Sequence, residues 1–214
     1  LGRTNLQVTQ VGFGGFPIMK VHRKVALKVI RRAYELDINY FDTARAYGES
    51  EEMIGDALRD VIDECIIATK THQRTKHSAA KAGIKKCLHK LGTDRIDIVQ
   101  LHGIDDDRKL AKAMGPEGSL SALKEARSEG RIDFIGISGH VPRVLIEAIK
   151  TDEFDVVLVP LNILTREASE ELIPMAKELD VGVVVMKPFG GINYSYVQRD
   201  TKTGLDGKYF RRYF

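Results

Sequence analysis

The chain has 214 residues, of which 43% are hydrophobic and 29% charged, values typical of a globular protein with one sizeable core. Its net charge of +3 is small and gives no argument for binding nucleic acid or an anionic membrane surface. No apolar run approaches the roughly 20 residues that a membrane span needs, and polar residues interrupt the first ten positions where a signal core would lie. Cys65 and Cys87 do not make a disulfide framework and fit a reducing compartment, so we expect a cytoplasmic protein.

Apolar, β-branched runs alternate with amphipathic stretches along the chain. The opening segment, residues 1–11, alternates Thr, Val and Leu and predicts a small hairpin closing the bottom of a barrel. Strands are predicted at residues 11–16, 39–43, 65–69, 96–101, 134–138, 156–161 and 182–186. Helices are predicted at residues 23–36, 50–59, 78–91, 119–128, 142–150 and 168–179, with Ser50, Ser78 and Ser119 as N-caps.

The strand runs are mostly continuous in apolar character rather than alternating, as in Val156-Val157-Leu158-Val159. Such strands are buried on both faces, which indicates a parallel sheet covered by helices and an α/β fold. Two architectures fit this count: a doubly wound sheet, and a (β/α)₈ TIM barrel whose last unit is missing. The first strand ends in Gly12-Phe13-Gly14-Gly15 without a later helix-opening glycine, which weakens the dinucleotide-binding doubly wound alternative.

The end of the chain follows a different pattern. Residues 1–191 carry the strand and helix repeat and are expected to form the barrel domain. Residues 192–214 are rich in Tyr, Arg, Lys, Gly and Asp and lack apolar periodicity, so they do not supply an eighth strand and helix. Either the chain is truncated before that unit, or 192–214 is the remnant of a C-terminal part from which segments are absent.

Polar residues recur where the predicted strands end. Asp42 ends the second strand and is followed by Tyr47, Lys70 ends the third, and His102 ends the fourth. In a parallel barrel these positions lie on the face where active sites are built. An acid that protonates a developing alkoxide suits carbonyl reduction, and a nearby ammonium would lower the pKa of a tyrosine from its free value of about 10.

The chain resembles the aldo-keto reductase family over nearly all of residues 1–191. Short motifs in the same order and at the same spacing carry this resemblance: Leu1-Gly2-Arg3-Thr4, Gly12-Phe13-Gly14-Gly15, Phe41-Asp42-Thr43-Ala44 with Tyr47-Gly48, Ala68-Thr69-Lys70, Leu91-Gly92-Thr93-Asp94, Leu101-His102, Gly136-Ile137-Ser138 and Met186-Lys187-Pro188. Each motif is weak alone, but the set is very specific.

The resemblance implies a (β/α)₈ barrel with NADPH across its C-terminal face, NADH being possible, and hydride transfer to the carbonyl of a small aldehyde or ketone. It implies that Tyr47 is the general acid, that Lys70 tunes its pKa, that Asp42 is the partner of Lys70, and that His102 orients the carbonyl. It also implies the cofactor-binding residues, which are Gly14, Gly15, Asp42, Ser138, Gly139, Met186, Lys187, Pro188, Phe189 and Gly190.

Three positions depart from the family pattern. Gly139 replaces an asparagine that often follows the serine, Leu158 replaces a glutamine of the sixth strand, and Met186 replaces a tyrosine that often stacks under the nicotinamide. The variants around His102, Ser138 and Met186 resemble a branch whose members often carry a C-terminal iron–sulfur extension, but this sequence has no cysteine cluster. No motif in the tail matches the usual site for the adenosine 2′-phosphate of NADP. A preference for NADP over NAD is therefore implied by the family resemblance alone.

Each of these residues has an ordinary structural interpretation when taken alone. Asp42 would be a turn or cap residue, Tyr47 a packing residue, Lys70 a solvated lysine and His102 a hydrogen-bonded core histidine. We expect no metal site: the other histidines lack metal-ligand spacing, and the run 105–107 is expected to be a solvated acidic loop. For His140, which follows the Ser-Gly pair at the active face, the alternative to a structural role is contact with cofactor or substrate.

Two functional hypotheses follow. The first is an NAD(P)H-dependent aldo-keto reductase acting on small carbonyl substrates. The second is a cofactor-binding sensor or scaffold of the same family with little catalysis, motivated by the missing unit and by Leu158 and Met186. A third possibility is a barrel too incomplete to bind the cofactor. The physiological substrate and the oligomeric state stay open at this point.

Overall fold

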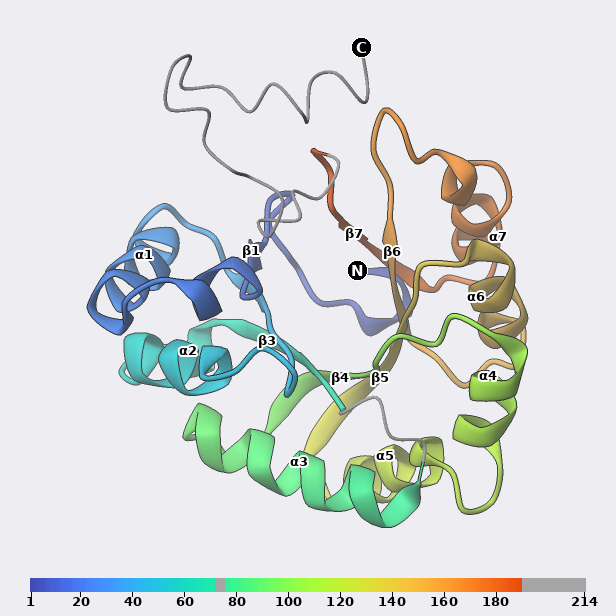
Figure 1. The fold of residues 1–214 in the computed structure, drawn as a ribbon, viewed down its shortest axis with the longest axis horizontal. Helices are drawn as coiled ribbons and strands as arrows, with labels where there is room; N and C mark the ends of the chain where they lie inside the picture. Colours follow the sequence, from blue (N-terminus) through green and yellow to red (C-terminus); the bar gives the residue numbers. More distant parts are fainter. Residues whose placement is uncertain (72–75, 190–214) are drawn as a thin grey trace.

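The computed structural model describes residues 1–71 and 76–189. Among these residues a single sheet of seven parallel strands is formed, in the order β1 to β7. The strands are β1 Phe13–Gly14, β2 Tyr40–Asp42, β3 Ile66–Lys70, β4 Ile96–Leu101, β5 Ile132–Ser138, β6 Val156–Pro160 and β7 Gly182–Met186. The sheet curls, so that its helices form an arc around the outside (Figure 1).

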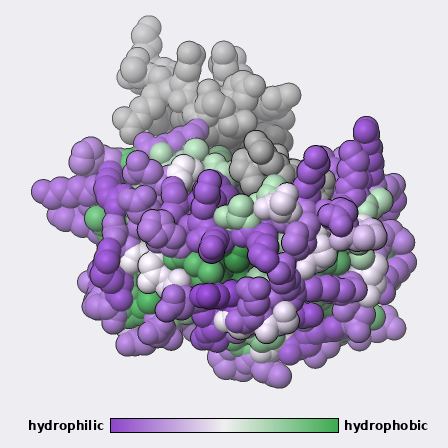
Figure 2. All heavy atoms as spheres, turned by 90° about the horizontal axis from the view of Figure 1, so that it is seen from below, coloured by the Kyte–Doolittle hydropathy of each residue, from purple (hydrophilic) through white to green (hydrophobic). Residues whose placement is uncertain are grey.

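Helices follow the strands and cover the outer face of the sheet (Figure 1). They are α1 Arg23–Glu35, α2 Ser50–Leu58, α3 His77–Leu91, α4 Asp107–Met114, α5 Ser119–Ser128, α6 Pro142–Ile149 and α7 Leu172–Glu178. Figure 2 shows the face formed by α3 and α5, which is mostly hydrophilic with apolar side chains in a groove between the helices; Ile84, Leu88 and Ala122 line it. No helix in the described ranges is long and apolar enough to cross a bilayer.

The strand order decides between the two architectures. A doubly wound sheet reverses its order at a switch point where the ligand binds. Here every strand pairs with its neighbour in the sequence, from Gly14 beside Asp42 to Pro160 beside Met186. The α/β fold with a parallel sheet is confirmed, and the doubly wound alternative is wrong.

In the central strands both faces of the sheet are mostly buried, as the apolar runs predict, whereas β7 at the edge leaves Val185 38% exposed. Phe41 is fully buried in the larger core between sheet and helices, whereas its neighbour Tyr40 points to the other face. On that inner face Tyr40, Ala68, Ile98 and Val156 form a smaller cluster. Successive side chains of a strand point to opposite faces, so one apolar run supplies both clusters.

The predicted N-terminal hairpin at residues 1–11 is wrong. The chain forms a 3-10 turn at Gly2–Thr4 and continues without strand pairing. The Thr4 hydroxyl donates to the Leu1 carbonyl at 2.6 Å, and Asn5 adopts a left-handed φ of 55°, so the local polar side chains favour a turn. The segment still lies against the sheet, because the backbone N–H of Arg3 donates to the Asp180 carbonyl at 2.6 Å.

The acidic run 105–107 is not a solvated loop throughout. Asp107 begins α4, a helix absent from the predicted set, and the Asp106 side chain caps it by accepting from the Lys109 backbone N–H at 2.8 Å. A short polar helix with Asp at its N-cap lacks the long apolar stripe on which the prediction depended.

The predicted serine N-caps are also wrong. Ser50 and Ser119 are the first residues of α2 and α5, and Ser78 lies inside α3. The three residues at the cap positions have no side-chain hydrogen bond to their helix; they are Glu49, Lys76 and Gly118. The Ser50 hydroxyl has other partners, described below. The predicted tail 192–214 lies outside the described residues.

Candidate active site

The strand ends bring the predicted site residues to one edge of the sheet. Asp42 is the last residue of β2, Lys70 is the last of β3, and His102 follows β4 directly. Tyr47 lies in the loop between β2 and α2. Because all strands run parallel, their carboxyl ends share an edge, and these four side chains meet there.

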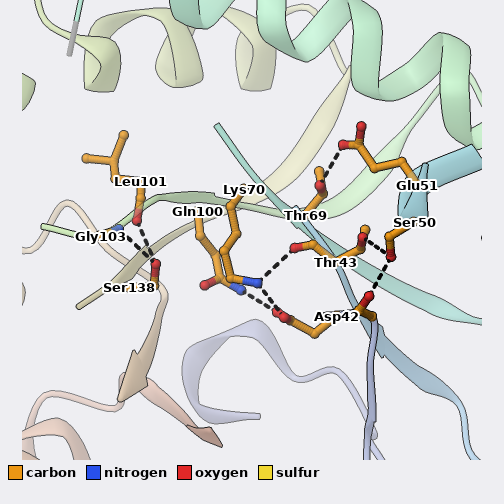
Figure 3. Close-up of polar contacts among 11 residues, drawn as sticks. Asp42, Thr43, Ser50, Glu51, Thr69, Lys70, Gln100, Leu101, Gly103 and Ser138 are labelled. Atoms are coloured by element: carbon orange, nitrogen blue, oxygen red, sulfur yellow. Dashed lines mark hydrogen bonds and ion pairs between the residues drawn. The ribbon is translucent and has the colours of Figure 1, made fainter. Parts of the chain in front are cut away.

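Asp42 and Lys70 form a buried ion pair. The Lys70 ammonium is 1% exposed and donates to Asp42 Oδ1 and, at 2.8 Å, to the Thr43 carbonyl (Figure 3). Burial lowers the pKa of Lys70, while the charge of Asp42 acts in the opposite direction. The carboxylate therefore keeps an otherwise costly buried ammonium charged and fixed in place.

Gln100 holds the other oxygen of Asp42. Its side-chain amide Nε2 donates to Asp42 Oδ2 at 3.1 Å, from a position on β4 directly beside Lys70 (Figure 3). Gln100 is fully buried, and a polar residue so close to the end of the run Ile96–Leu101, where the strand meets the site edge, is the sequence signal that could have marked it. It was not among the predicted site residues.

Tyr47 lies between the ion pair and His102. Its ring meets the His102 ring edge to face, with centroids 5.9 Å apart and planes at 84°. The Lys70 Nζ lies 5.3 Å from the Tyr47 ring centroid, and Phe16 covers the ring with centroids 5.2 Å apart. The arrangement brings a phenol, an ammonium, a carboxylate and an imidazole together, which is a set suited to giving a proton to a polarised oxygen.

The expected lowering of the pKa of Tyr47 is not found. Burial raises the pKa of its phenol above the ordinary value, and the negative charge of Asp42 acts in the same direction. Burial is the larger of these two effects, and the nearby Lys70 ammonium does not reverse the rise in the Tyr47 pKa. In this structure Tyr47 is therefore a phenol across the neutral pH range, the form that can donate a proton.

Ser138 lies at the end of β5 beside His102. Its buried hydroxyl donates to the Leu101 carbonyl at 3.1 Å and accepts from the Gly103 N–H at 3.3 Å (Figure 3). These two backbone groups flank His102. Ser138 thus lies at the carboxyl edge of the sheet with the other predicted site residues, and its hydroxyl fixes the backbone on both sides of His102.

Gly139 and His140 pack against the loop after β4. A Cβ at Gly139 would lie 2.5 Å from the Ile104 carbonyl oxygen, so the asparagine often found at this position would not fit without backbone movement. Asp105 Oδ1 accepts from the His140 backbone N–H at 2.6 Å and lies 3.3 Å from its ring Nδ1. His140 is thus held at the rim of the site.

The two predicted glycines after β1 have different surroundings. A Cβ at Gly15 would lie 2.5 Å from the Ser50 hydroxyl and 3.0 Å from the Asp42 carbonyl oxygen, whereas a Cβ at Gly14 would meet no atom within 4 Å. Gly15 is required for close packing behind Asp42. Gly14 leaves an open, exposed backbone surface at the site.

The segment after β7 supplies a second open surface. Lys187, Pro188 and Phe189 are exposed, Phe189 at 93%, and Lys187 has a left-handed φ of 58°. Asn162 holds this segment by donating from Nδ2 to the Lys187 carbonyl at 3.1 Å. Gly190, the last predicted cofactor residue, lies outside the described residues. Within the described ranges no group of three or more His, Cys, Asp or Glu side chains is placed to hold a metal ion.

A sequence model of the Aldo/keto reductase family matches residues 10–207. The chain belongs to the aldo-keto reductase family. Its order of motifs, its sequential parallel sheet and its Asp42, Tyr47, Lys70 and His102 cluster agree with this assignment.

Individual aldo-keto reductases and related oxidoreductases align over most of the chain. An uncharacterized oxidoreductase of Bacillus subtilis, YqkF, is 32% identical over 203 residues, which cover 88% of this chain and 63% of that protein. A solved aldo-keto reductase of Bacillus halodurans, in its holo form, is 31% identical with a TM-score of 0.76 and covers 86% of this chain and 64% of the other. An aldo/keto reductase of Klebsiella pneumoniae, solved in complex with NADP and acetate, shares the fold at 21% identity and a TM-score of 0.71, over 83% of this chain and 63% of the other.

The chain is shorter than these aldo-keto reductases. It spans 63%, 58% and 64% of the length of three curated relatives, from Bacillus subtilis, Glycine max and Arabidopsis thaliana. The match covers the strands β1 to β7 and the four site residues, which lie between residues 42 and 102.

Proposed function

We propose that this protein reduces a small aldehyde or ketone with a hydride from NAD(P)H, and that Tyr47 is the proton donor. The observation that carries the proposal is the position of the Tyr47 ring between the Lys70 ammonium and the His102 ring, at the carboxyl edge of the sheet. A phenol between a cation and an imidazole is poorly explained by packing alone, and it supplies what a developing alkoxide needs.

In the proposed reaction Tyr47 gives its phenolic proton to the carbonyl oxygen. Burial keeps this proton on Tyr47 until a strongly basic alkoxide develops beside it. The Lys70 ammonium then stabilises the phenolate that remains, and Asp42 keeps Lys70 charged and directed toward the ring. His102 faces the same ring and orients the carbonyl.

The residues flanking Tyr47 fit the nicotinamide end of the cofactor. Gly14 leaves open backbone at the end of β1, and the half-buried Met186 at the end of β7 is followed by an exposed surface formed by residues 187–189. We infer that Gly14, Ser138 and these residues hold the cofactor. When bound, the reduced nicotinamide supplies the hydride. NADPH is the cofactor we expect, because the Klebsiella pneumoniae structure of the same fold contains NADP.

A (β/α)₈ barrel is the architecture proposed for the whole protein. The curled sheet has its neighbours in chain order from β1 to β7, and its two outer strands are β1 and β7. Closing the barrel needs an eighth unit between them, which the described residues do not supply. The mass of the intact gene product tests this, because a mass matching the sequence printed here would argue against an eighth unit.

A cofactor-binding member with little catalysis is the second candidate. The observation that favours it is Leu158, which is buried on β6 where its apolar side chain offers no hydrogen bond to a carboxamide. A glutamine is common at that position in the family, so this protein would hold the nicotinamide with fewer polar contacts.

One experiment separates the two candidates. Cofactor binding is measured on the full-length protein by fluorescence titration, beside oxidation of NADPH and NADH with a panel of short aldehydes and ketones. A reductase binds the cofactor and oxidises it only when a carbonyl compound is present. Tight binding without oxidation under any carbonyl would favour the sensor, and absence of binding would contradict both.

A further inference from the structure

We propose that Glu51 is a positioning residue: its buried carboxylate ties the loop that carries Tyr47 to the strand that carries Lys70, and so fixes the proton donor relative to the ammonium. This inference rests on the proposed function, since it names a residue that acts through the Tyr47 site. Glu51 is not one of the four site residues and bonds to residues beside them, and the resemblance assigns it no role.

Glu51 has two partners, one on each side of the site. Its Oε1 accepts from the Thr69 hydroxyl at 2.8 Å, and Thr69 immediately precedes Lys70 on β3 (Figure 3). Its Oε2 pairs with the Arg45 guanidinium at 2.5 Å, and Arg45 lies two residues before Tyr47. One carboxylate thus joins the loop that carries Tyr47 to the strand that carries Lys70.

Ser50, the residue before Glu51, makes a second pair of ties. Its hydroxyl donates to the Gly15 carbonyl at 2.9 Å and accepts from the Thr43 hydroxyl at 2.8 Å (Figure 3). Thr43 follows Asp42, so the first turn of α2 contacts the backbone next to Asp42, Tyr47 and Lys70. The Ser50 N–H also donates to the Tyr47 carbonyl at 3.0 Å.

The burial of Glu51 argues against a surface ion pair. Its side chain is 1% exposed and that of Arg45 is 16% exposed, so neither partner is free to rotate into solvent. A buried carboxylate is costly and gives little net stability compared with an apolar side chain of the same size. Such pairs specify one arrangement of the segments they join, and here these segments carry Tyr47 and Lys70.

The Cys87 thiol completes the surroundings of Glu51. Burial raises the pKa of Cys87 well above its ordinary value, and the adjacent Glu51 carboxylate raises it further. Cys87 therefore stays a neutral thiol on α3 and adds no charge to the cluster. The cation that balances Glu51 is Arg45, which makes Arg45 the right residue to change together with it.

The test uses a double variant of the full-length protein, Arg45→Met with Glu51→Gln. Removing both charges leaves no buried charge without a partner, so folding is retained while the tie between loop and strand is cut. The control is Arg23→Met with Glu52→Gln, the same substitutions on the α1–α2 surface, where Arg23 also pairs with Glu49 and Asp56 and every partner is more exposed than Glu51. Both proteins are compared with wild type in kcat, KM and cofactor affinity.

The expected result is a fall in kcat of roughly 10²-fold for the Arg45/Glu51 variant, because a displacement of about 1 Å at a reacting group has an effect of that size. KM and cofactor affinity stay within about twofold, since the loss concerns only the transition state. The control keeps the wild-type kcat. A double variant that folds and turns over as fast as the control would overturn the proposal.

Two further measurements distinguish a failure of this inference from a folding defect and from a failure of the proposed function. Thr69→Val removes one hydroxyl and little else; a lower kcat at unchanged KM supports the tie, and an unchanged kcat contradicts it. The second is the phenolate absorbance of Tyr47, obtained as a difference from Tyr47→Phe in each background. A loosened loop exposes the phenol, which faces Asp42, Lys70 and His102, and its pKa falls toward the ordinary value. This fall in the Tyr47 pKa is expected even if wild type reduces no carbonyl compound. Its absence would contradict the positioning role of Glu51 and would leave the proposed function untouched.

Discussion

The ion pair between Asp42 and Lys70 makes an asymmetric prediction about stability. Asp42→Asn leaves an ammonium that is 1% exposed without its counter-charge, whereas Lys70→Met leaves a carboxylate that is 16% exposed and still bonded to Gln100. Removing the partner of a fully buried charge costs about 3–5 kcal/mol of unfolding free energy. For Lys70→Met we expect the smaller loss of about 1–3 kcal/mol, because Asp42 keeps one donor and some contact with water.

The variants are compared by urea unfolding at pH 7 under one set of conditions. The double variant Asp42→Asn with Lys70→Met has no unpaired charge, and we expect its stability within about 2 kcal/mol of wild type. A double-mutant cycle with this pattern shows that Asp42 and Lys70 are energetically coupled. Equal losses for the two single variants, or a double loss equal to their sum, would refute the reasoning.

The pH dependence of the unfolding free energy of Asp42→Asn tests the charge of Lys70 independently. Burial lowers the pKa of Lys70, and the variant removes the carboxylate that opposes this effect. Between the lowered folded pKa and the unfolded value of about 10.4, the unfolded chain binds more protons than the folded protein, so stability rises with pH. The stability lost in Asp42→Asn should therefore shrink as the pH is raised toward 10, and a deficit that stayed constant would contradict a buried ammonium.

Three further predictions concern single side chains. Because burial raises the pKa of Tyr47, its phenolate absorbance should appear above the ordinary pKa of about 10; ionisation at or below that value would contradict a buried phenol. Gly15→Ala places a Cβ 2.5 Å from the Ser50 hydroxyl and should lower the unfolding free energy by about 1–3 kcal/mol, whereas Gly14→Ala, with no atom within 4 Å, should be neutral in the same urea titration. Ser138→Ala removes both hydrogen bonds to the backbone on either side of His102 and should lower the unfolding free energy by about 1–3 kcal/mol. An unchanged melting curve would show that the hydroxyl does not hold that backbone.

The sequence predicts the sheet well because its central strands are mostly buried on both faces. Continuous runs such as Val156-Val157-Leu158-Val159 indicate parallel strands, and β4 and β7 have the predicted bounds, Ile96–Leu101 and Gly182–Met186. The errors lie where local polar side chains decide the structure. Thr4 and Asn5 make a turn in place of a hairpin, and Asp106 begins a short helix that has no long apolar stripe.

The positions of the four site residues could also be predicted, since each follows or ends a strand and parallel strands share an edge. Gln100, Ser50 and Glu51 were missed as supporting residues because their partners are distant in the sequence. Ser50 looks like an N-cap and Glu51 like a favourable first-turn charge; only the folded chain shows their contacts with Gly15 and Thr69. The direction of the pKa shift of Tyr47 was missed for a related reason, because burial of the phenol is a tertiary effect.

The central claim, that Tyr47 donates the proton in carbonyl reduction, is tested most directly by Tyr47→Phe in the full-length protein. The variant keeps the ring that packs on Phe16 and His102 and loses only the hydroxyl. NADPH oxidation is followed by absorbance with any aldehyde that wild type reduces, and cofactor affinity by fluorescence. The account predicts a fall in kcat of about 10²–10⁴-fold with nearly unchanged cofactor affinity. Turnover equal to that of wild type would contradict it.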